Sequence, residues 1–142
     1  MNSTMNDLLV MLLVEDNPAD VVFFNEAIEA GKVSARVCVV ANGEAAMQFL
    51  RHESEFVHAP RPDVLVLDLN LPIKKGQEIL REMAADPQLR TIPVAILTTS
   101  TSERYVCDLY PAGRCLYFVK THSFGQLQEI VKQIALHAGL PQ

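Results

Sequence analysis

The sequence predicts an α/β domain with a doubly wound, five-stranded parallel sheet and helices on both faces. Continuous apolar runs such as 8–14 and 64–67 lack the alternation of a half-exposed strand, so they are typical of strands buried on both faces. Helical patterns separate these runs, and alternating strands and helices favour parallel pairing with right-handed crossovers. A length of 142 residues, 49% of them hydrophobic, fits one domain with a full core.

The first half of the chain is expected to contain two strand–helix units. Residues 8–14 form the first strand, and a helix with a proline in its first turn follows until Gly31, which is placed to cap it. The β-branched run 35–41 predicts the second strand, and residues 44–52 predict the second helix. The proline-containing segment 53–62 is expected to be a loop.

The second half begins with the third strand, residues 64–67, which an Asp and a Pro terminate. Apolar residues on one face predict a short helix at 77–85, and the run 93–97 predicts the fourth strand. Ser102 is expected to cap a helix over 103–110, although the apolar face of that helix is weak.

The last unit consists of a strand at 115–119 and a helix that begins after Ser123, which is placed to cap it. The tail from His137 onward is expected to fray. One apolar stripe runs along the helix at helical spacing. Its central members are Leu127, Ile130, Val131 and Ile134.

Composition excludes several classes of protein. A net charge of -5 and scattered basic residues argue against binding to a nucleic acid backbone. No apolar stretch is long enough to cross a bilayer, and residues 1–7 do not resemble a signal peptide, so a cytoplasmic location is expected. Three cysteines without C-x-x-C spacing predict reduced thiols rather than a disulfide framework or a zinc site. The histidines lack an acid partner and are expected at the surface: His52, His58, His122 and His137.

Acidic side chains follow two predicted strands at the point where each strand ends. Glu15 and Asp16 come directly after the first strand, and Asp68 follows the third. The carboxyl edge of an open parallel sheet is where ligands bind, so we expect these carboxylates to meet there. Like charges at close range need a cation between them, and carboxylates with a loop carbonyl are typical Mg²⁺ ligands. The sequence therefore predicts a Mg²⁺ or Mn²⁺ site held by these acids and the backbone carbonyl of Asn70.

A hydroxyl and an ammonium group are expected at the same edge. Thr98 follows the fourth strand, and Lys120 follows the fifth. A cation, an ammonium group and a hydroxyl suit phosphoryl transfer, because the transition state spreads negative charge over three oxygens. We therefore interpret Asp68 as the acceptor of a phosphoryl group.

Three stretches of sequence resemble the receiver domain of two-component response regulators. They are VEDNPAD (14–20), RPDVLVLDLNLP (61–72) and IPVAILTTS (92–100). The intervals also match that family, because Thr98 lies 30 positions after Asp68 and Lys120 lies 22 positions after Thr98. More narrowly, the motifs are similar to those of the single-domain regulators that partner cyanobacterial and bacterial phytochromes.

The resemblance implies a flavodoxin-like sheet with strand order 2-1-3-4-5 and one receiver domain over residues 1–142, with no effector domain and with flexible ends at 1–6 and 138–142. It implies that a sensor histidine kinase phosphorylates Asp68. Thr98 and Lys120 would bind the phosphoryl oxygens, and the rotamer of Tyr117 would change on activation. The surface of the fourth helix, fifth strand and fifth helix would then change with it.

The chain departs from the family pattern beside the site. Thr121 stands where a proline usually follows the lysine. The phytochrome-associated group also often lacks this proline. The β-branched Thr99 stands where a small residue is usual. Together with Asn70 and Ser100, it is expected to modulate access to the phosphoryl group.

Each site residue also has an ordinary structural interpretation. An acid pair suits the start of a helix, a threonine suits a strand end, and Lys120 alone could be a solvated charge. Tyr117 alone could be strand packing, and Asp68 with Asn70 could make turn contacts. Their joint occurrence at successive strand ends, with the family spacing, favours the phosphoryl site.

Other functions fit less well. A haloacid-dehalogenase-type phosphatase needs a second acid two residues after its nucleophile, where this chain has Asn70. A flavodoxin-like cofactor binder needs a phosphate-binding loop where this chain has acids. The resemblance implies a signalling protein rather than an enzyme. The main alternative is a pseudo-receiver that has lost phosphorylation and acts as a constitutive interaction module.

Output is expected through protein contacts. The expected partners are a sensor histidine kinase of the phytochrome class, a downstream histidine phosphotransfer protein and a second copy of the chain. We expect a homodimer through the last strand and helix, with neither nucleic acid nor membrane as a partner. The residues assigned to the dimer contact are those of the apolar stripe, Leu127, Ile130, Val131 and Ile134.

Overall fold

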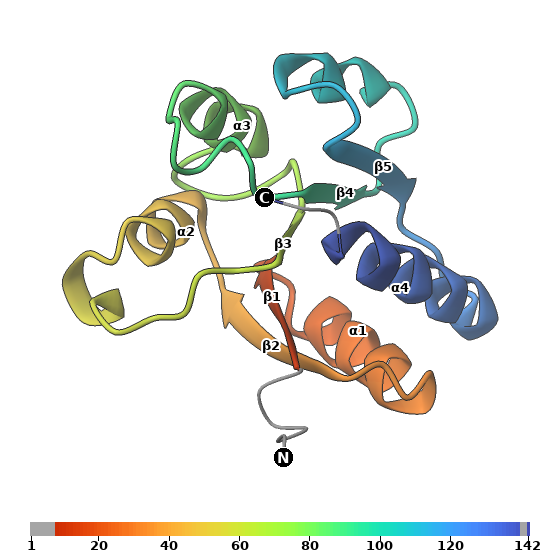
Figure 1. Cartoon of the computed structure of the whole chain (residues 1–142). Coiled ribbons are helices and arrows are strands. Elements are labelled where there is room, and N and C mark those ends of the chain that lie inside the picture. The colour runs from red at the N-terminus through yellow and green to blue at the C-terminus, as the bar shows by residue number, and fades with distance from the viewer. Residues whose placement is uncertain (1–7, 140–141) are drawn as a thin grey trace.

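Five parallel strands form one sheet in the computed structural model, which describes residues 8–139 and 142. The order is β2-β1-β3-β4-β5, so the predicted fold class and strand order are confirmed (Figure 1). The strands are β1 (Leu9–Val14), β2 (Ala35–Val40), β3 (Val64–Leu67), β4 (Val94–Thr98) and β5 (Cys115–Val119). The α-helices are α1 (Pro18–Ala30), α2 (Gly43–Leu50), α3 (Gly76–Ala84) and α4 (Phe124–Ala138), and the 3-10 helices are η2 (Ser54–Phe56) and η3 (Arg104–Leu109).

The helices divide between the two faces of the sheet. α1 and α4 lie side by side on one face, and α2, α3 and η3 cover the other (Figure 1). The side chains of β3 alternate between two hydrophobic clusters, with Leu65 and Leu67 in one and Val64 and Val66 in the other. All four are 0% exposed, which explains why this strand has no polar alternation.

Parallel pairing brings the carboxyl ends of the central strands to one edge. Val14 pairs with both Val40 and Leu67, so the acids that follow β1 and β3 emerge together. On the other side of β3, Thr98 pairs with Val119, and the backbone N–H of Lys120 donates to the Thr98 carbonyl at 2.7 Å. The register therefore places the predicted site residues along one edge of the sheet.

Side-chain caps begin the two helices that flank this edge. The Asn17 carboxamide oxygen accepts the backbone N–H groups of Ala19 at 2.9 Å and Asp20 at 3.3 Å. The predicted Ser123 cap is confirmed, because its hydroxyl accepts the Gln126 N–H at 3.2 Å. These caps satisfy N–H groups that the first turn of a helix leaves without an intrahelical partner.

The predicted helix at 103–110 is wrong in type. Residues 104–109 form the 3-10 helix η3, and Ser102 does not cap it. Glu103 precedes the helix without a side-chain cap, while the Ser102 N–H bonds to the Ser100 hydroxyl. A weak apolar face, no cap and Pro111 just beyond the end leave little to sustain regular α-helical turns.

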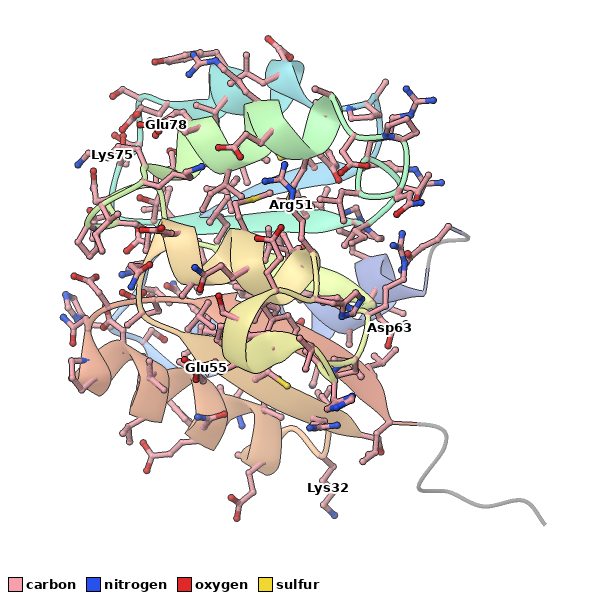
Figure 2. All side chains as sticks on the ribbon, turned by 90° about the vertical axis from the view of Figure 1, so that its left-hand side faces the viewer. Lys32, Arg51, Glu55, Asp63, Lys75 and Glu78 are labelled. Atoms are coloured by element: carbon pink, nitrogen blue, oxygen red, sulfur yellow. A yellow bond between two sulfur atoms is a disulfide. The ribbon has the colours of Figure 1, made fainter. Side chains whose placement is uncertain are left out.

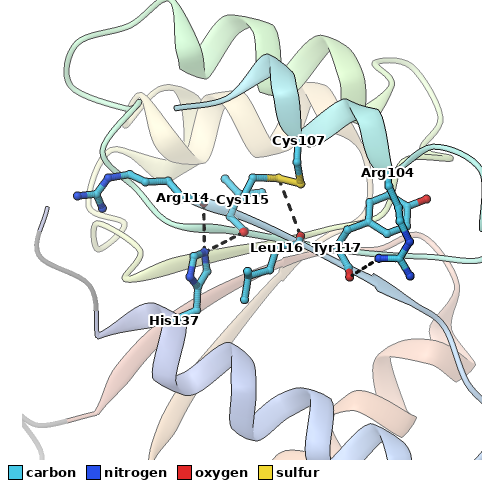
Figure 3. Close-up of a disulfide and its surroundings, with 8 residues drawn as sticks. Arg104, Cys107, Arg114, Cys115, Leu116, Tyr117 and His137 are labelled. Atoms are coloured by element: carbon cyan, nitrogen blue, oxygen red, sulfur yellow. Dashed lines mark hydrogen bonds between the residues drawn. A yellow bond between two sulfur atoms is a disulfide. The ribbon is translucent and has the colours of Figure 1, made fainter. Parts of the chain in front are cut away.

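The end of the chain is more ordered than expected. α4 continues to Ala138, and His137 is 7% exposed rather than on the surface. Its Nε2 lies 3.1 Å from the carbonyl oxygens of both Val94 and Arg114, so the imidazole joins α4 to the starts of β4 and β5 (Figure 3). The expected fraying from His137 is therefore wrong, and the expectations for residues 1–6 and 140–141 lie outside the described residues.

The thiol prediction is also wrong for two of the three cysteines. Cys107 in η3 and Cys115 at the start of β5 form a disulfide, with their Cα atoms 5.3 Å apart (Figure 3). Cys38 in β2 is a free cysteine. Neither an odd count nor the absence of C-x-x-C spacing could reveal a pair that a turn brings together.

The apolar stripe of α4 faces the sheet. Leu127 is 4% exposed, Val131 and Ile134 are 0% exposed, and Ile130 packs against the same cluster. Leu127, Val131 and Ile134 are therefore core residues and cannot form the predicted contact with a second copy while they remain there, whereas Ile130 is half-buried and keeps part of its surface open. The homodimer remains a prediction.

Charged side chains join the helices on the opposite face. Arg51 at the end of α2 lies 3.4 Å from the Glu82 carboxylate of α3, and Lys74 also pairs with Glu82. Figure 2 shows this side of the molecule, with Arg51 between the two helices and Lys75 and Glu78 at the surface. Within the described part of the chain, no helix combines the length and the apolar character needed to cross a membrane.

Candidate functional site

Asp68 lies directly after the buried strand β3 and is itself 6% exposed. One carboxylate oxygen accepts the backbone N–H of Asn70 at 3.1 Å, and the other accepts the Lys120 ammonium at 2.9 Å. Gly76 approaches this loop so closely that a Cβ there would lie 2.8 Å from the Asp68 carbonyl oxygen. The absence of a side chain at Gly76 therefore helps to set the path of the chain at Asp68.

Glu15 and Asp16 adjoin Asp68, as the sequence predicted. One carboxylate oxygen from each of the three can be chosen so that all lie within 4.8 Å of one another. Glu15 is 5% exposed, whereas Asp16 is open to solvent. Burial raises the pKa of the Glu15 carboxyl, while its hydrogen bond with Lys120 opposes that rise. Hard carboxylate oxygens at this spacing fit a divalent cation such as Mg²⁺ or Mn²⁺.

Lys120 follows β5 and reaches across to the acids. Its ammonium nitrogen lies 2.7 Å from Glu15, 2.8 Å from Asp20 and 2.9 Å from Asp68. Burial alone would lower the pKa of Lys120, but the hydrogen bonds to these three carboxylates raise it above its ordinary value. An ammonium has three N–H donors, so these carboxylates can engage all of them.

Asp20 is a site residue that the sequence argument did not assign. It lies in the first turn of α1, and its side chain is 39% exposed. The available signal was its position four residues after Asp16, within the quoted VEDNPAD motif, because the first turn of α1 starts at the same edge of the sheet. Asp20 does not belong to the group of three carboxylates and contacts Lys120 instead.

The Thr98 hydroxyl is buried without a partner. Thr98 is 0% exposed, and its Oγ1 has no hydrogen bond to any residue that the structure describes. A buried hydroxyl without a partner is unfavourable unless a ligand engages it. Thr99, by contrast, is exposed and lines a groove of about 960 Å³ together with Asp20 and Lys120.

Tyr117 and Ser100 are brought together beside this edge. The Tyr117 hydroxyl donates to the Ser100 carbonyl at 2.6 Å, so the ring is held against the loop that follows Thr98. Arg104 of η3 lies over the ring, with its guanidinium carbon 5.0 Å from the ring centroid. Arg104 was not among the predicted site residues, because its position over the ring depends on the 3-10 geometry of η3, which the sequence did not predict.

The arrangement combines a nearly buried carboxylate, two further acids suited to a cation, a lysine ammonium and a buried hydroxyl without a partner. The model for the family described as the response regulator receiver domain matches residues 11–132. The chain belongs to the response regulator receiver family.

Its relatives include phytochrome response regulators. The response regulator Rcp1 of Synechocystis sp. (strain ATCC 27184 / PCC 6803 / Kazusa) is 37% identical over 134 residues, which cover 94% of this chain and 91% of Rcp1. The crystal structure of the phosphorylated cyanobacterial phytochrome response regulator RcpA is 42% identical and superimposes with a TM-score of 0.78, covering 89% of this chain and 91% of RcpA. The Mn²⁺-bound form of Rcp1 is 35% identical with a TM-score of 0.82, covering 94% of this chain and 99% of Rcp1.

Proposed function

We propose that this receiver accepts a phosphoryl group on Asp68 from a sensor histidine kinase of the phytochrome class and acts as one receiver unit of a two-component pathway. The observation that carries the proposal is the placement of a nearly buried Asp68 carboxylate 2.9 Å from the Lys120 ammonium and beside two further acids. The names of RcpA and the other phytochrome response regulators support the choice of kinase.

In the proposed reaction, an oxygen of Asp68 forms a bond to phosphorus as the bond between phosphorus and the donor's imidazole nitrogen breaks. The electron pair of that bond leaves with the imidazole. Lys120 would pair with one phosphoryl oxygen, and the Thr98 hydroxyl would donate to another. The Lys120 ammonium at 2.9 Å from Asp68 and the buried, unpartnered Thr98 hydroxyl support these roles. Both groups are held on the sheet before reaction, which lowers the cost of organising them around the transition state.

Glu15, Asp16 and Asp68, with the Asn70 carbonyl, are the residues that would hold Mg²⁺ or Mn²⁺. When bound, the cation supplies positive charge against the phosphoryl oxygens. The donor set supports this assignment because its carboxylates lie within reach of one ion, and the exposed Asp16 leaves room for water ligands.

Signal output is proposed to involve the switch surface, defined as η3, β5 and α4. A new dianion on Asp68 would draw the Thr98 hydroxyl toward it. Tyr117 would then exchange its bond to the Ser100 carbonyl for a position closer to the space that Thr98 leaves. The kinase, a histidine phosphotransfer protein or a second copy of the chain would bind the switch surface differently after this change.

The proposed function is tested by intact mass after incubation with acetyl phosphate, with and without Mg²⁺. We expect a Mg²⁺-dependent gain of one phosphoryl group in the wild type and none in Asp68→Asn. Asp63→Asn is a control acid substitution away from the site, because Asp63 bonds to the backbone N–H of Val10. Failure of the wild type under conditions that label an ordinary receiver would favour the pseudo-receiver instead.

The proposed phytochrome kinase partner and the proposed homodimer need separate tests. Transfer from a purified phytochrome kinase, compared with a kinase of another sensor class, tests the partner. Light scattering before and after phosphorylation tests the homodimer, and a monomer in both states would refute it.

A further inference from the structure

The disulfide between Cys107 and Cys115 joins η3 to β5 within the switch surface (Figure 3). A second contact joins the same two elements. Arg104 of η3 lies over the Tyr117 ring of β5 at 5.0 Å, and its guanidinium donates to the Tyr117 carbonyl at 3.4 Å. η3 is therefore attached to β5 at two points, one covalent and one not.

The covalent attachment adjoins the residue proposed to switch. Cys115 and Tyr117 are two residues apart in one strand, so their side chains leave the same face of the sheet. Both pack against the cluster that contains Val106 and Tyr110, and Cys107 packs against it too. A movement of the Tyr117 ring on this face would therefore press on the segment that Cys107 anchors.

The crosslink limits that movement in a way that the other contact does not. The Arg104 contact can break and re-form on an exposed side chain, whereas a disulfide keeps its two Cα atoms at nearly constant separation. The bridge spans only eight positions, from Cys107 to Cys115, and includes the turn at Gly113 with a φ of 80°. Reduction would remove the covalent restraint from this short segment, while Tyr110 within it stays in the core cluster.

We propose that Cys107 and Cys115 form a redox-sensitive pair that regulates the receiver switch, with the disulfide restraining η3 against β5 and the dithiol releasing it. The inference rests on the proposed function of Asp68. The class of co-reactant is a small thiol and its disulfide. Both cysteines are half-buried, so neither is sealed in the core.

Thiol–disulfide exchange supplies a balanced reaction. A thiolate of the co-reactant attacks one protein sulfur, and the other protein sulfur leaves as a thiolate that takes up a proton. A second co-reactant thiolate then attacks the mixed disulfide and releases the co-reactant as its disulfide, so two thiols are oxidised as the protein pair is reduced. The reverse sequence restores the bridge.

A regulatory coupling of this kind has to be reciprocal. If the disulfide disfavours the phosphorylated arrangement, a phosphoryl group must shift the thiol–disulfide equilibrium toward the dithiol by the same factor. A crosslink that only stabilises the fold would not respond to the state of Asp68. This difference separates regulation from a purely structural role.

The experiment equilibrates the full chain in glutathione redox buffers, with and without Mg²⁺ and beryllofluoride as the phosphoryl mimic. Alkylation of free thiols and intact mass then give the disulfide fraction. We expect the mimic to shift the equilibrium constant toward the dithiol by about 5- to 20-fold, within the usual range of allosteric coupling. Cys38→Ser is the matched control, since Cys38 lies outside the bridge, and it should show the same shift.

The reciprocal arm measures the affinity of the oxidised and reduced proteins for beryllofluoride in the presence of Mg²⁺, and it also checks that acetyl phosphate labels both. Oxidation should weaken the beryllofluoride affinity of the wild type and of Cys38→Ser by the same factor, but not that of Cys107→Ser or Cys115→Ser. Equal affinities in the two redox states, a thiol–disulfide equilibrium that the mimic does not change, or a pair that never oxidises would overturn the redox inference alone. A lack of label in both redox states would overturn the proposed function and the inference together.

Discussion

Ile73 has an unusual backbone conformation in the loop between Asp68 and α3. Its φ is 69°, in the left-handed region, and its side chain is 74% exposed. A β-branched residue seldom adopts this region, because its Cβ substituents crowd the backbone. Glycine has no such crowding, so Ile73→Gly should stabilise the folded protein.

The size of the effect follows from two opposing contributions. The left-handed conformation costs an L-residue about 1 to 2 kcal/mol, which glycine avoids. Glycine gives back about 0.5 to 1 kcal/mol because its unfolded chain is more flexible. The Ile73 side chain is largely exposed, so its removal sacrifices little apolar burial. The expected net gain is about 0.5 to 1 kcal/mol.

Urea unfolding measures this difference. With a slope of about 2 kcal/mol per molar urea, the midpoint should rise by about 0.3 to 0.5 M. His52→Gly is a matched control, because His52 is exposed and has a φ of 57° but is not β-branched, so it should gain less. Labelling by acetyl phosphate should be retained in both variants. A midpoint for Ile73→Gly at or below that of the wild type would refute the assignment of strain to this residue.

Three further predictions concern the site and its support. Gly76→Ala should lower stability by about 1 to 3 kcal/mol and slow acetyl phosphate labelling, because the new Cβ would lie 2.8 Å from the Asp68 carbonyl oxygen; unchanged values in both assays would contradict the close approach. Lys120→Ala should lower metal-free stability by about 3 kcal/mol by leaving carboxylates unpaired. Mg²⁺ should raise the urea midpoint of Lys120→Ala more than that of the wild type. An equal rise in the two proteins would show that the ammonium and the cation do not share these acids. Tyr110→Phe should cost about 1 to 3 kcal/mol at pH 7, because the Tyr110 hydroxyl donates to the Leu89 and Ile92 carbonyls at 2.9 and 2.7 Å. Burial raises the Tyr110 pKa above 10.0, so the wild type should lose stability as pH rises above 10, and a matching loss in Tyr110→Phe would assign it to other groups.

The fold and the main acids could be predicted because they depend on features that lie close together in the sequence. The uninterrupted apolar run of β3 predicts its burial on both faces, and Asp68 follows this run directly. Glu15 and Asp16 follow β1 in the same way. Parallel pairing then brings these strand ends together, so their proximity follows from the topology.

The remaining errors involve contacts that the local sequence pattern does not encode. The stripe of α4 has the same spacing whether it faces a sheet or a second protein, and only the packed structure shows that it faces the sheet. His137 looked like a surface residue because its acceptors are backbone carbonyls of Val94 and Arg114, which have no sequence signature. The Cys107–Cys115 pair depends on the turn after η3 in the same way.

The charge balance of the site implies an order of events. Glu15, Asp16, Asp20 and Asp68 place four carboxylates around the single ammonium of Lys120, so with the acids ionised this set carries a net charge of -3. A phosphoryl donor brings further negative charge, which such a site would repel. A divalent cation reduces the net charge to about -1. It also takes over part of the pairing with the carboxylates, so these acids hold the Lys120 ammonium less tightly. Cation binding should therefore precede phosphoryl transfer. At low donor concentration, the labelling rate should be half-maximal at the Mg²⁺ concentration that equals the Mg²⁺ dissociation constant measured without donor. Rates that are independent of Mg²⁺ would show that Lys120 alone offsets the acids.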